Sequence, residues 1–304
     1  MAQEVDPALA DMMEAVFAEH SRDGDLWRRL DELGLIRLTG AEETGGSGAG
    51  WFEAAELQTA AIRHGARIPL AEHDLLACWL LEAADMPVDG AVRTVALVDE
   101  DGRAAGVPWV STAERIVIVW PAGDGYLAAD IEPDHVRITP GTNMIGEPRD
   151  TVVADLGAFE GIPVAADLVA QLRLKAALVR SIQVCAALDR ALELSIEHTT
   201  SREQFGRPLS KFQSVQHLIS DIAAEAALAR SATEAALSTA VASDWSAPQL
   251  EFLVAAARSC PGHAASVVVR NAHQVHGAMG TTREHQLHDY TRAALAWRSE
   301  FGSV

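Results

Sequence analysis

The chain has 304 residues, of which 49% are hydrophobic and 22% charged, a balance typical of a globular protein and not of a disordered one. Its 43 acidic and 24 basic residues give a formal net charge of −19. This charge argues against a nucleic-acid binder or a binder of anionic membranes, because such proteins neutralise phosphates with Lys and Arg. An anionic ligand must therefore meet basic residues that gather locally.

The sequence carries no targeting signal that we can identify. The N-terminal stretch MAQEVDPALADMMEAVFAEH lacks a basic segment followed by an apolar run, and no uninterrupted apolar stretch has membrane-spanning length. Cys78, Cys185 and Cys260 each lie in an Ala- and Leu-rich helical context, which favours core residues in a reducing compartment over a disulfide or a metal site. We therefore expect a cytoplasmic protein with no membrane segment.

Residues 1–88 are predicted to form an N-terminal helical domain. Apolar residues recur at helical spacing, and a glycine-rich loop, GAEETGGSGAG, interrupts them at residues 40–50. Helices are expected over residues 6–20, 25–35, 51–64 and 69–84.

Residues 89–160 are predicted to form a small β domain. The short β-branched runs AVRTVALV, RIVIVW, GYLAAD, HVRIT and TVVAD are separated by turn sequences such as DEDG and PGTN. This texture predicts an antiparallel sheet of roughly five or six strands.

Residues 161–304 are predicted to form a C-terminal four-helix bundle. Apolar residues recur at steps of three and four along several long segments, and the corners between the segments are short. The segment 247–276 contains Cys260-Pro261-Gly262, which is expected to interrupt and kink the helix. The other helices are expected over 166–200, over about 212–226 and over about 284–298.

The corner SREQFGRPLSKFQSVQH, residues 201–217, concentrates cationic and amide side chains around a Gly-Arg-Pro break. A guanidinium such as that of Arg202 matches phosphate oxygens in a forked geometry, and a helix start favours anions, so the corner is a candidate anion site. Two plainer interpretations stay open. Ser210 and Gln213 have the spacing of a helix capping box, and Arg202 could be a surface ion-pair partner of Glu197 or Glu203.

Four histidines near the C-terminus raise the question of a metal site. His273 and His276 are three residues apart, as are His285 and His288, and this spacing is compatible with metal ligands. No carboxylate or thiolate pattern completes a usual site, so no metal is predicted.

The order of helices, small sheet and four-helix bundle, together with two motifs, resembles the acyl-CoA dehydrogenase family. SREQFGRPLSKFQSVQHLISD (201–221) matches the family pattern Arg-x-x-Phe-Gly-x-Pro-Leu-x-x-Phe-Gln at the corner between the first two bundle helices. QVHGAMGTTREHQLHDYTR (274–292) resembles the family's Gln-x-x-Gly-Gly-x-Gly turn and the helix after it. The resemblance covers essentially the whole chain and implies a mainly α fold with a shortened β domain.

The resemblance also implies FAD and a reaction that introduces an α,β double bond into an acyl-CoA thioester, with a carboxylate as the base. In the family's tetramers the bundle corner of one subunit contacts the FAD held by its neighbour. Carried over to this chain, the implied FAD-contacting residues are Arg202 at the pyrophosphate, Phe205 beside the cofactor, Gln213 at the phosphate–ribose region, and Gln274, Gly277 and Ala278 at the adenosine end.

Two features of the family pattern are missing. Between residues 85 and 160 we find neither the Thr/Ser-Glu-Pro-x-Ala-Gly-Ser turn nor the Trp-Ile-Thr/Ser segment that cradles the flavin ring. Of the family's two positions for the catalytic Glu, one falls near Ala176, beside Lys175, where there is no acid, and the other falls at Phe301. Glu300 is one residue early, an offset that turns a helical side chain by about 100°. Glu300 is nevertheless the candidate base within this chain; the plainer interpretation, a solvated acid near the chain end, stays open.

These departures resemble the short subunit of the heterotetrameric α2β2 acyl-CoA dehydrogenases of actinobacterial steroid catabolism. A full-length partner subunit would then supply the flavin-ring cradle and the Glu, the substrate would be a steroid-derived acyl-CoA, and electron-transferring flavoprotein would be the acceptor. Two alternatives stay open: a self-sufficient homo-oligomeric acyl-CoA dehydrogenase with Glu300 as base, and a non-enzymatic helical interaction protein of the same fold.

Overall fold

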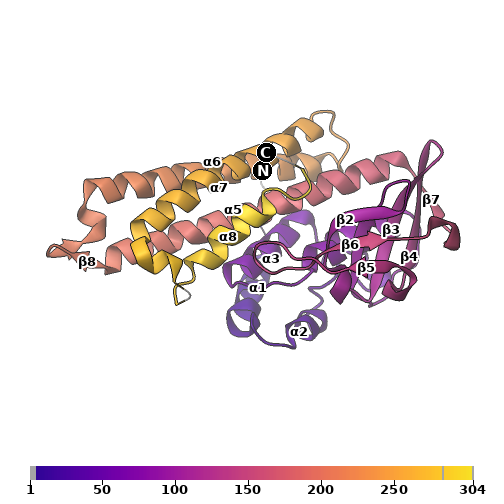
Figure 1. Ribbon diagram of the computed structural model, residues 1–304, viewed down its shortest axis with the longest axis horizontal. Helices are drawn as coiled ribbons and strands as arrows, with labels where there is room; N and C mark the ends of the chain where they lie inside the picture. Colours follow the sequence, from indigo (N-terminus) through magenta and orange to yellow (C-terminus); the bar gives the residue numbers. More distant parts are fainter. Residues whose placement is uncertain (1–4, 283, 303–304) are drawn as a thin grey trace. The chain divides into compact units, whose positions relative to one another are not determined.

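A computed structural model describes residues 5–282 and 284–302 of the chain (Figure 1). The chain forms two compact units. One contains residues 5–57 together with Arg67–Ala176, and the other contains Gln58–Ala66 together with residues 177–282 and 284–302. The three-domain division at residues 88 and 160 stays a prediction.

The first unit begins with short helices that lie close to their predicted positions. The helices are α1 (Pro7–His20), α2 (Leu26–Glu32), α3 (Trp51–Arg63, shared with the second unit), the π-helical segment η2 (Ala71–Cys78) and α4 (Trp79–Ala83). Asp6 caps α1 by accepting a hydrogen bond from the Ala8 N–H at 2.9 Å, and Pro7 fits the first turn. In the glycine-rich loop, a Cβ on Gly46 would lie 2.1 Å from the Gly40 carbonyl oxygen, so this close crossing of backbone requires glycine.

The segment predicted as one α-helix over 69–84 is instead wound as π-helix before α4 begins. All eight residues of η2 are buried, including four with ionisable side chains. Two of these bond to other parts of the chain: Asp74 Oδ2 accepts the Thr39 N–H at 3.1 Å, and His73 Nδ1 accepts the Arg93 N–H at 3.1 Å. Such tertiary bonds have no counterpart in apolar periodicity, so the sequence pattern could not indicate the wider winding.

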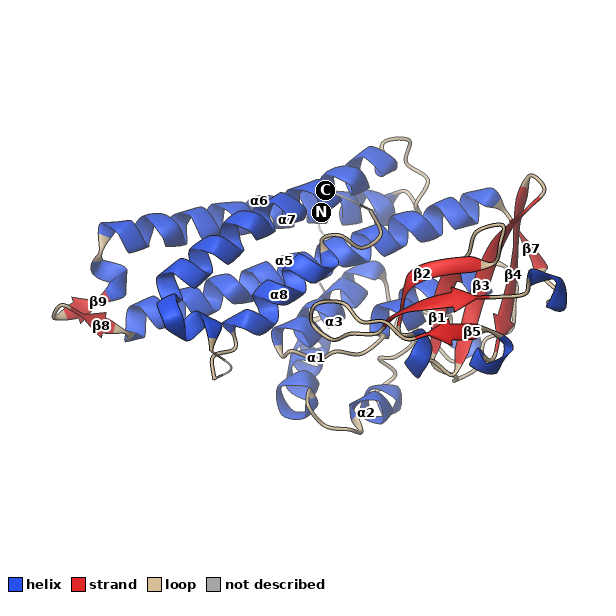
Figure 2. Cartoon of the chain, viewed as in Figure 1, coloured by secondary structure: helices blue, strands red, loops and turns tan. Residues whose placement is uncertain are grey.

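The β region contains two sheets (Figure 2). The first has the order β1-β3-β4-β7 and the second the order β2-β6-β5. β1 and β3 run parallel, with Val95 opposite Val117, because the chain passes through β2 in the other sheet between them. The expectation of a purely antiparallel sheet is therefore wrong for this pair. The strands are β1 (Arg93–Leu97), β2 (Arg103–Pro108), β3 (Arg115–Ala122), β4 (Gly125–Ile131), β5 (Arg137–Thr139), β6 (Arg149–Val153) and β7 (Ile162–Val164).

Both faces of the first sheet are buried, which explains why β3 reads as a continuous apolar run. Ile116 and Ile118 point to one face and pack in a core with Val152 of the second sheet. Val117 and Val119 point to the opposite face, in a core that includes Leu80 and Leu81 of α4 and Leu172 of α5.

The second unit is the helical bundle (Figures 1 and 2). Its elements are α5 (Ala166–Ser201, from Ala177 onward), the short hairpin of β8 (Glu203–Gln204) and β9 (Arg207–Pro208), α6 (Gln213–Ala242), α7 (Leu250–His276), the 3₁₀ turn η7 (Gly277–Thr281) and α8 (Leu287–Trp297). Buried alanines such as Ala229 and Ala236 on α6 and Ala257 and Ala264 on α7 allow close approach of helices.

α7 departs from its prediction in two respects. It runs through Pro261 as one helix, so the expected interruption is wrong; Pro261 is buried in the bundle, where packing offsets its missing hydrogen bond. By length and composition the stretch Leu250–Thr281 could also cross a membrane, which was not expected. Buried bundle helices have the same composition, and 44% of its most apolar window is buried.

Candidate functional site

The corner between α5 and α6 presents an aromatic side chain to the surface. Phe205 and Gly206 form the two-residue loop of the β8–β9 hairpin, and both have positive φ angles, 53° and 78°, as a type I′ turn requires. The Phe205 side chain is 92% exposed and meets the Phe212 ring edge-on at 6.2 Å. The Arg207 guanidinium lies 4.2 Å from the centre of the Phe212 ring. The corner therefore exposes a Phe in a turn with a strained backbone, and this Phe packs against Phe212.

Arg202 and Gln213, at the two ends of this corner, are exposed. The Arg202 backbone is fixed, because its N–H donates to the His198 carbonyl and its carbonyl accepts the Leu209 N–H, both at 2.9 Å. Within residues 5–282 and 284–302 its guanidinium makes no ion pair, whereas Glu197 pairs with Arg190 at 3.3 Å. The surface ion-pair interpretation of Arg202 is therefore wrong for the described residues.

The capping-box interpretation of Ser210 and Gln213 is also wrong. α6 begins at Gln213, its N-cap is Phe212, and this cap makes no side-chain hydrogen bond. The side chain that returns to the Ser210 carbonyl is that of Gln216, whose Nε2 donates at 2.9 Å. Gln213 is thus not needed to cap the helix.

The second motif forms the end of α7 and the turn after it. Gly277 has φ 58° and ψ −142°, a backbone conformation that is essentially restricted to glycine, and its N–H donates to the His273 carbonyl. A Cβ at Gly277 would meet nothing within 4 Å. The glycine is therefore required by the backbone, and it leaves open space on the exposed surface that Gln274 and Ala278 share.

The two motifs lie at the same end of the bundle (Figure 1). The ring of His198, one turn before Arg202, stacks on the ring of His276, which directly precedes Gly277; the centroids are 4.5 Å apart. Burial lowers the pKa of His276 to about 4 and also lowers the pKa of His198. Both imidazoles are therefore neutral at pH 7, and the permanent positive charge here comes from the arginines.

Glu300, the candidate base, is bound to a buried arginine. Arg180 Nε donates to Glu300 Oε2 at 2.7 Å; the Arg180 side chain is 2% exposed and that of Glu300 16%. Arg258, also buried, donates from Nη2 to the backbone carbonyls of Arg298 and Glu300 at 2.8 and 2.7 Å. A carboxylate held by a guanidinium is a weaker base, so this contact fits a structural role better than proton abstraction.

The other family position for the base is apolar. Ala176 is 3% exposed and belongs to the core cluster of the first unit. The neighbouring Lys175 ammonium lies between two indole rings, 4.8 Å from the centre of Trp51 and 4.4 Å from that of Trp79. This position offers no carboxylate.

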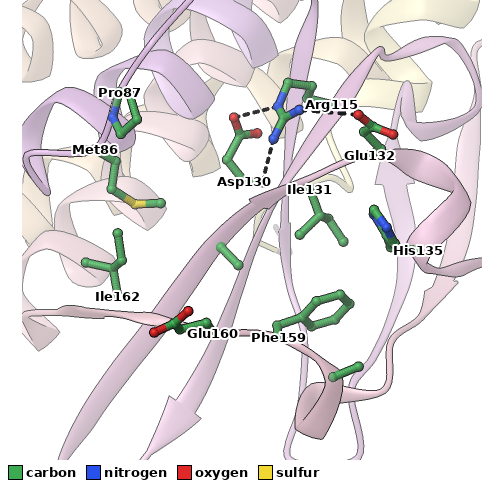
Figure 3. A pocket seen from close by; sticks show the side chains of 12 residues that line it. Met86, Pro87, Arg115, Asp130, Ile131, Glu132, His135, Phe159, Glu160 and Ile162 are labelled. Atoms are coloured by element: carbon green, nitrogen blue, oxygen red, sulfur yellow. Dashed lines mark hydrogen bonds and ion pairs between the residues drawn. The ribbon is translucent and has the colours of Figure 1, made fainter.

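The first unit contains a pocket of about 530 Å³ with walls formed by Met86, Ile131, Phe159 and Ile162, among others (Figure 3). Arg115 is the one Arg or Lys among the described lining residues. Its Nε donates to Asp130 Oδ2 at 2.7 Å and its Nη2 to the Asp130 carbonyl, also at 2.7 Å. Because Asp130 neutralises this cation, the pocket is poorly suited to the diphosphate of a nucleotide cofactor.

Comparison with known proteins identifies the class of protein that this fold represents. Residues 1–84 match the N-terminal domain of the acyl-CoA dehydrogenases, and residues 160–303 match their C-terminal domain. The chain belongs to the acyl-CoA dehydrogenase family. The predicted family, fold class and oxidoreductase assignment are thereby confirmed.

Individual proteins agree with this assignment. The chain is 29% identical over 284 residues to acyl-CoA dehydrogenase IpdE2 of Mycolicibacterium smegmatis, covering 92% of this chain and 84% of that protein. Its fold is similar to that of a chain in the ChsE4–ChsE5 complex of Mycobacterium tuberculosis, with a TM-score of 0.88 and 21% identity over 100% of this chain and 94% of the other. A chain of the Tcur3481–Tcur3483 steroid ACAD is similar too, with a TM-score of 0.84 and 22% identity over 97% and 93% of the two chains.

Proposed function

We propose that this chain is the subunit of a heteromeric, FAD-dependent acyl-CoA dehydrogenase that completes the FAD site of a full-length partner subunit. The supporting observation is the group of exposed side chains at one end of the bundle: Arg202 and Gln213 lack partners within the described chain, and Phe205 is 92% exposed. These exposed side chains stand on a fixed backbone. They are therefore suited to bind a ligand that is held by another subunit.

The chemistry of these groups fits the dinucleotide tail of FAD. The Arg202 guanidinium would bind the pyrophosphate, Gln213 would bond to the phosphate–ribose region, and Phe205 would pack beside the cofactor. Gln274, Gly277 and Ala278 would hold the adenosine end, where the open space above Gly277 admits close approach. When bound, FAD supplies the acceptor for the β hydride of the acyl group.

The carboxylate that removes the α proton would come from the partner subunit. In this chain Glu300 is engaged by Arg180, and the alternative position is Ala176 in an apolar core. The self-sufficient alternative needs Glu300 to leave its buried arginine during each turnover. A division of labour, with the phosphate contacts here and the base in the partner, avoids that cost.

The substrate class and the remaining partners extend this proposal. One fold neighbour was solved as a ChsE4–ChsE5 complex and another is a steroid ACAD, so we propose a partner subunit of the same family and a steroid-derived acyl-CoA substrate. Electron-transferring flavoprotein would reoxidise the flavin, and the site of action would be the cytoplasm.

Coexpression tests the proposal. The chain produced alone should contain no stoichiometric flavin and should not oxidise acyl-CoA thioesters. Coproduced with full-length family members from the same genome, it should purify in a yellow complex with one of them, as measured by flavin absorbance and subunit stoichiometry. Stoichiometric FAD and turnover in the isolated chain would refute the proposal and favour the self-sufficient enzyme.

In the flavin-containing complex, Arg202→Gln should weaken FAD binding by roughly 10- to 100-fold, because a charge-assisted hydrogen bond to phosphate is lost. FAD titration of the deflavinated complex, followed by flavin fluorescence, measures this change. Arg22→Gln is the matched control, since Arg22 is an exposed arginine of the other unit and should leave the affinity unchanged. Equal FAD affinity in the Arg202 variant and the wild type would remove Arg202 from the proposed site.

A further inference from the structure

Three imidazole side chains from three separate segments converge at the end of the bundle. His198 lies near the end of α5, His276 is the last residue of α7, and His285 lies in the segment before α8. One ring nitrogen from each lies within 4.8 Å of the others. The ring centroid of His276 lies 4.5 Å from that of His198 and 4.7 Å from that of His285. We refer to these three residues as the histidine cluster.

His276 is prepared as a metal ligand. Its Nδ1 lies 2.8 Å from the Ala272 carbonyl oxygen, which only accepts, so Nδ1 carries the proton and Nε2 has the free lone pair. The residue is only 4% exposed, and its Nε2 is buried with no hydrogen-bond partner in the described chain. A backbone carbonyl that fixes one nitrogen while the other is free is the usual arrangement behind a metal-bound histidine. A buried nitrogen without a partner would otherwise be a net cost to folding.

The other two rings can complete the set. The His198 ring is half-buried and makes no hydrogen bond within residues 5–282 and 284–302, so either of its nitrogens can present the lone pair. Nδ1 of His285 accepts the Leu287 N–H at 3.1 Å. Ligation by His285 gives up that bond, at a net cost of about 1 kcal/mol, which is small beside the binding energy of a zinc site.

We propose that the histidine cluster binds one divalent late transition-metal ion, such as Zn²⁺, through three imidazole nitrogens. Imidazole selects Zn²⁺, Co²⁺, Ni²⁺ and Cu²⁺ over Mg²⁺ and Ca²⁺, which require oxygen ligands. Zn–N bonds of about 2.0–2.1 Å place tetrahedral ligands roughly 3.3 Å apart, so the rings must close in by rotation of the side chains. Three protein ligands leave a fourth position for water.

Such an ion would connect the two motifs of the candidate site. His198 is followed one turn later by Arg202, whose N–H donates to the His198 carbonyl, and His276 is followed directly by Gly277. The metal would therefore tie the end of α5 to the turn after α7. The proposal concerns only residues of this chain and does not depend on flavin binding.

Zn²⁺ binding to the tag-free, full-length chain tests this proposal, either alone or in the complex in which it is purified. After treatment with EDTA, Zn²⁺ is titrated in competition with a chromophoric chelator, and Co²⁺ is added separately to record its visible spectrum. We expect one Zn²⁺ per chain, an intense tetrahedral Co²⁺ spectrum, and no competition from Mg²⁺. His276→Gln and His198→Gln should each lower the Zn²⁺ affinity by at least about tenfold, since even loss of an outer partner has that effect.

The controls are His217→Gln and His263→Gln, which change exposed histidines outside the cluster and should leave the affinity unchanged. His198 is half-buried, so its variant keeps the test valid if the His276 variant does not fold; thermal unfolding without metal checks this. Zn²⁺ should raise the unfolding temperature of the wild type and not that of the folded variants. Substoichiometric binding, or binding that both cluster variants retain, would overturn the proposal.

Discussion

Glu300→Gln is expected to lower the free energy of unfolding by about 3 kcal/mol, because it leaves the buried Arg180 cation without the carboxylate that faces it. The effect is increased by Arg258, a second buried arginine nearby, which binds the Glu300 backbone carbonyl. Urea unfolding of the purified chain or complex measures the change. Glu251→Gln, an exposed acid on α7, carries the same change of charge and should stay within about 0.5 kcal/mol of the wild type.

The same variant separates the two catalytic hypotheses. If Glu300 is structural, an assembled complex that contains Glu300→Gln keeps its turnover per bound flavin, although it unfolds more easily. If Glu300 is the base, the variant keeps its flavin but loses turnover, and it loses stability as well because the contact with Arg180 is the same in both cases. Arg180→Met in the Glu300→Gln background should recover part of the lost stability in either case, since it removes the buried cation whose carboxylate was lost, so turnover per bound flavin is the measurement that separates the two hypotheses.

The sequence predicted the features that depend on neighbouring residues. The helical spacing placed α1, α3, α5 and α8 within a few residues of their positions, and β-branched runs indicated most of the strands. The pairing of the strands was harder to predict from the sequence. The parallel alignment of β1 with β3 depends on β2 leaving for another sheet, which is a property of the topology and not of any short segment.

The candidate site likewise contains residues that the sequence indicated and residues that it did not. Arg202, Phe205 and Gln213 lie in one contiguous motif, so a pattern of residue types could indicate them. His198 was missed because its partners His276 and His285 come from later segments, and only the packing of α5 beside the end of α7 brings the rings together. Arg258 had a detectable signal: it is a charged residue directly after the apolar run FLVAAA. That signal does not indicate which backbone carbonyls near Glu300 the Arg258 guanidinium binds.

The second large effect concerns Asp74, a buried carboxyl on η2. Burial raises its pKa from 3.8 to about 7, because the Thr39 N–H and the more distant Arg37 only partly compensate for the loss of water; Oδ1 has no partner in the described chain. The folded protein therefore binds a proton that the unfolded chain releases near pH 4. Stability should fall as the pH rises from about 4 to 7, by up to roughly 4 kcal/mol, and level off above that.

Asp74→Asn should remove this pH dependence, because an amide stays neutral and its oxygen can still accept the Thr39 N–H. We expect the variant to be more stable than the wild type at pH 8 by about 2–3 kcal/mol and nearly equal to it at pH 4.5. The gain at pH 8 is smaller than the roughly 4 kcal/mol lost by the wild type, because burying the new NH₂ group costs free energy. Urea unfolding at the two pH values measures both differences. Asp31→Asn, an exposed acid of the same unit, should change neither. Equal stability of the Asp74 variant and the wild type at pH 8 would contradict this expectation. It would mean that Arg37 is an effective counter-ion for an ionised Asp74, and that the burial of Asp74 does not limit the stability of the first unit.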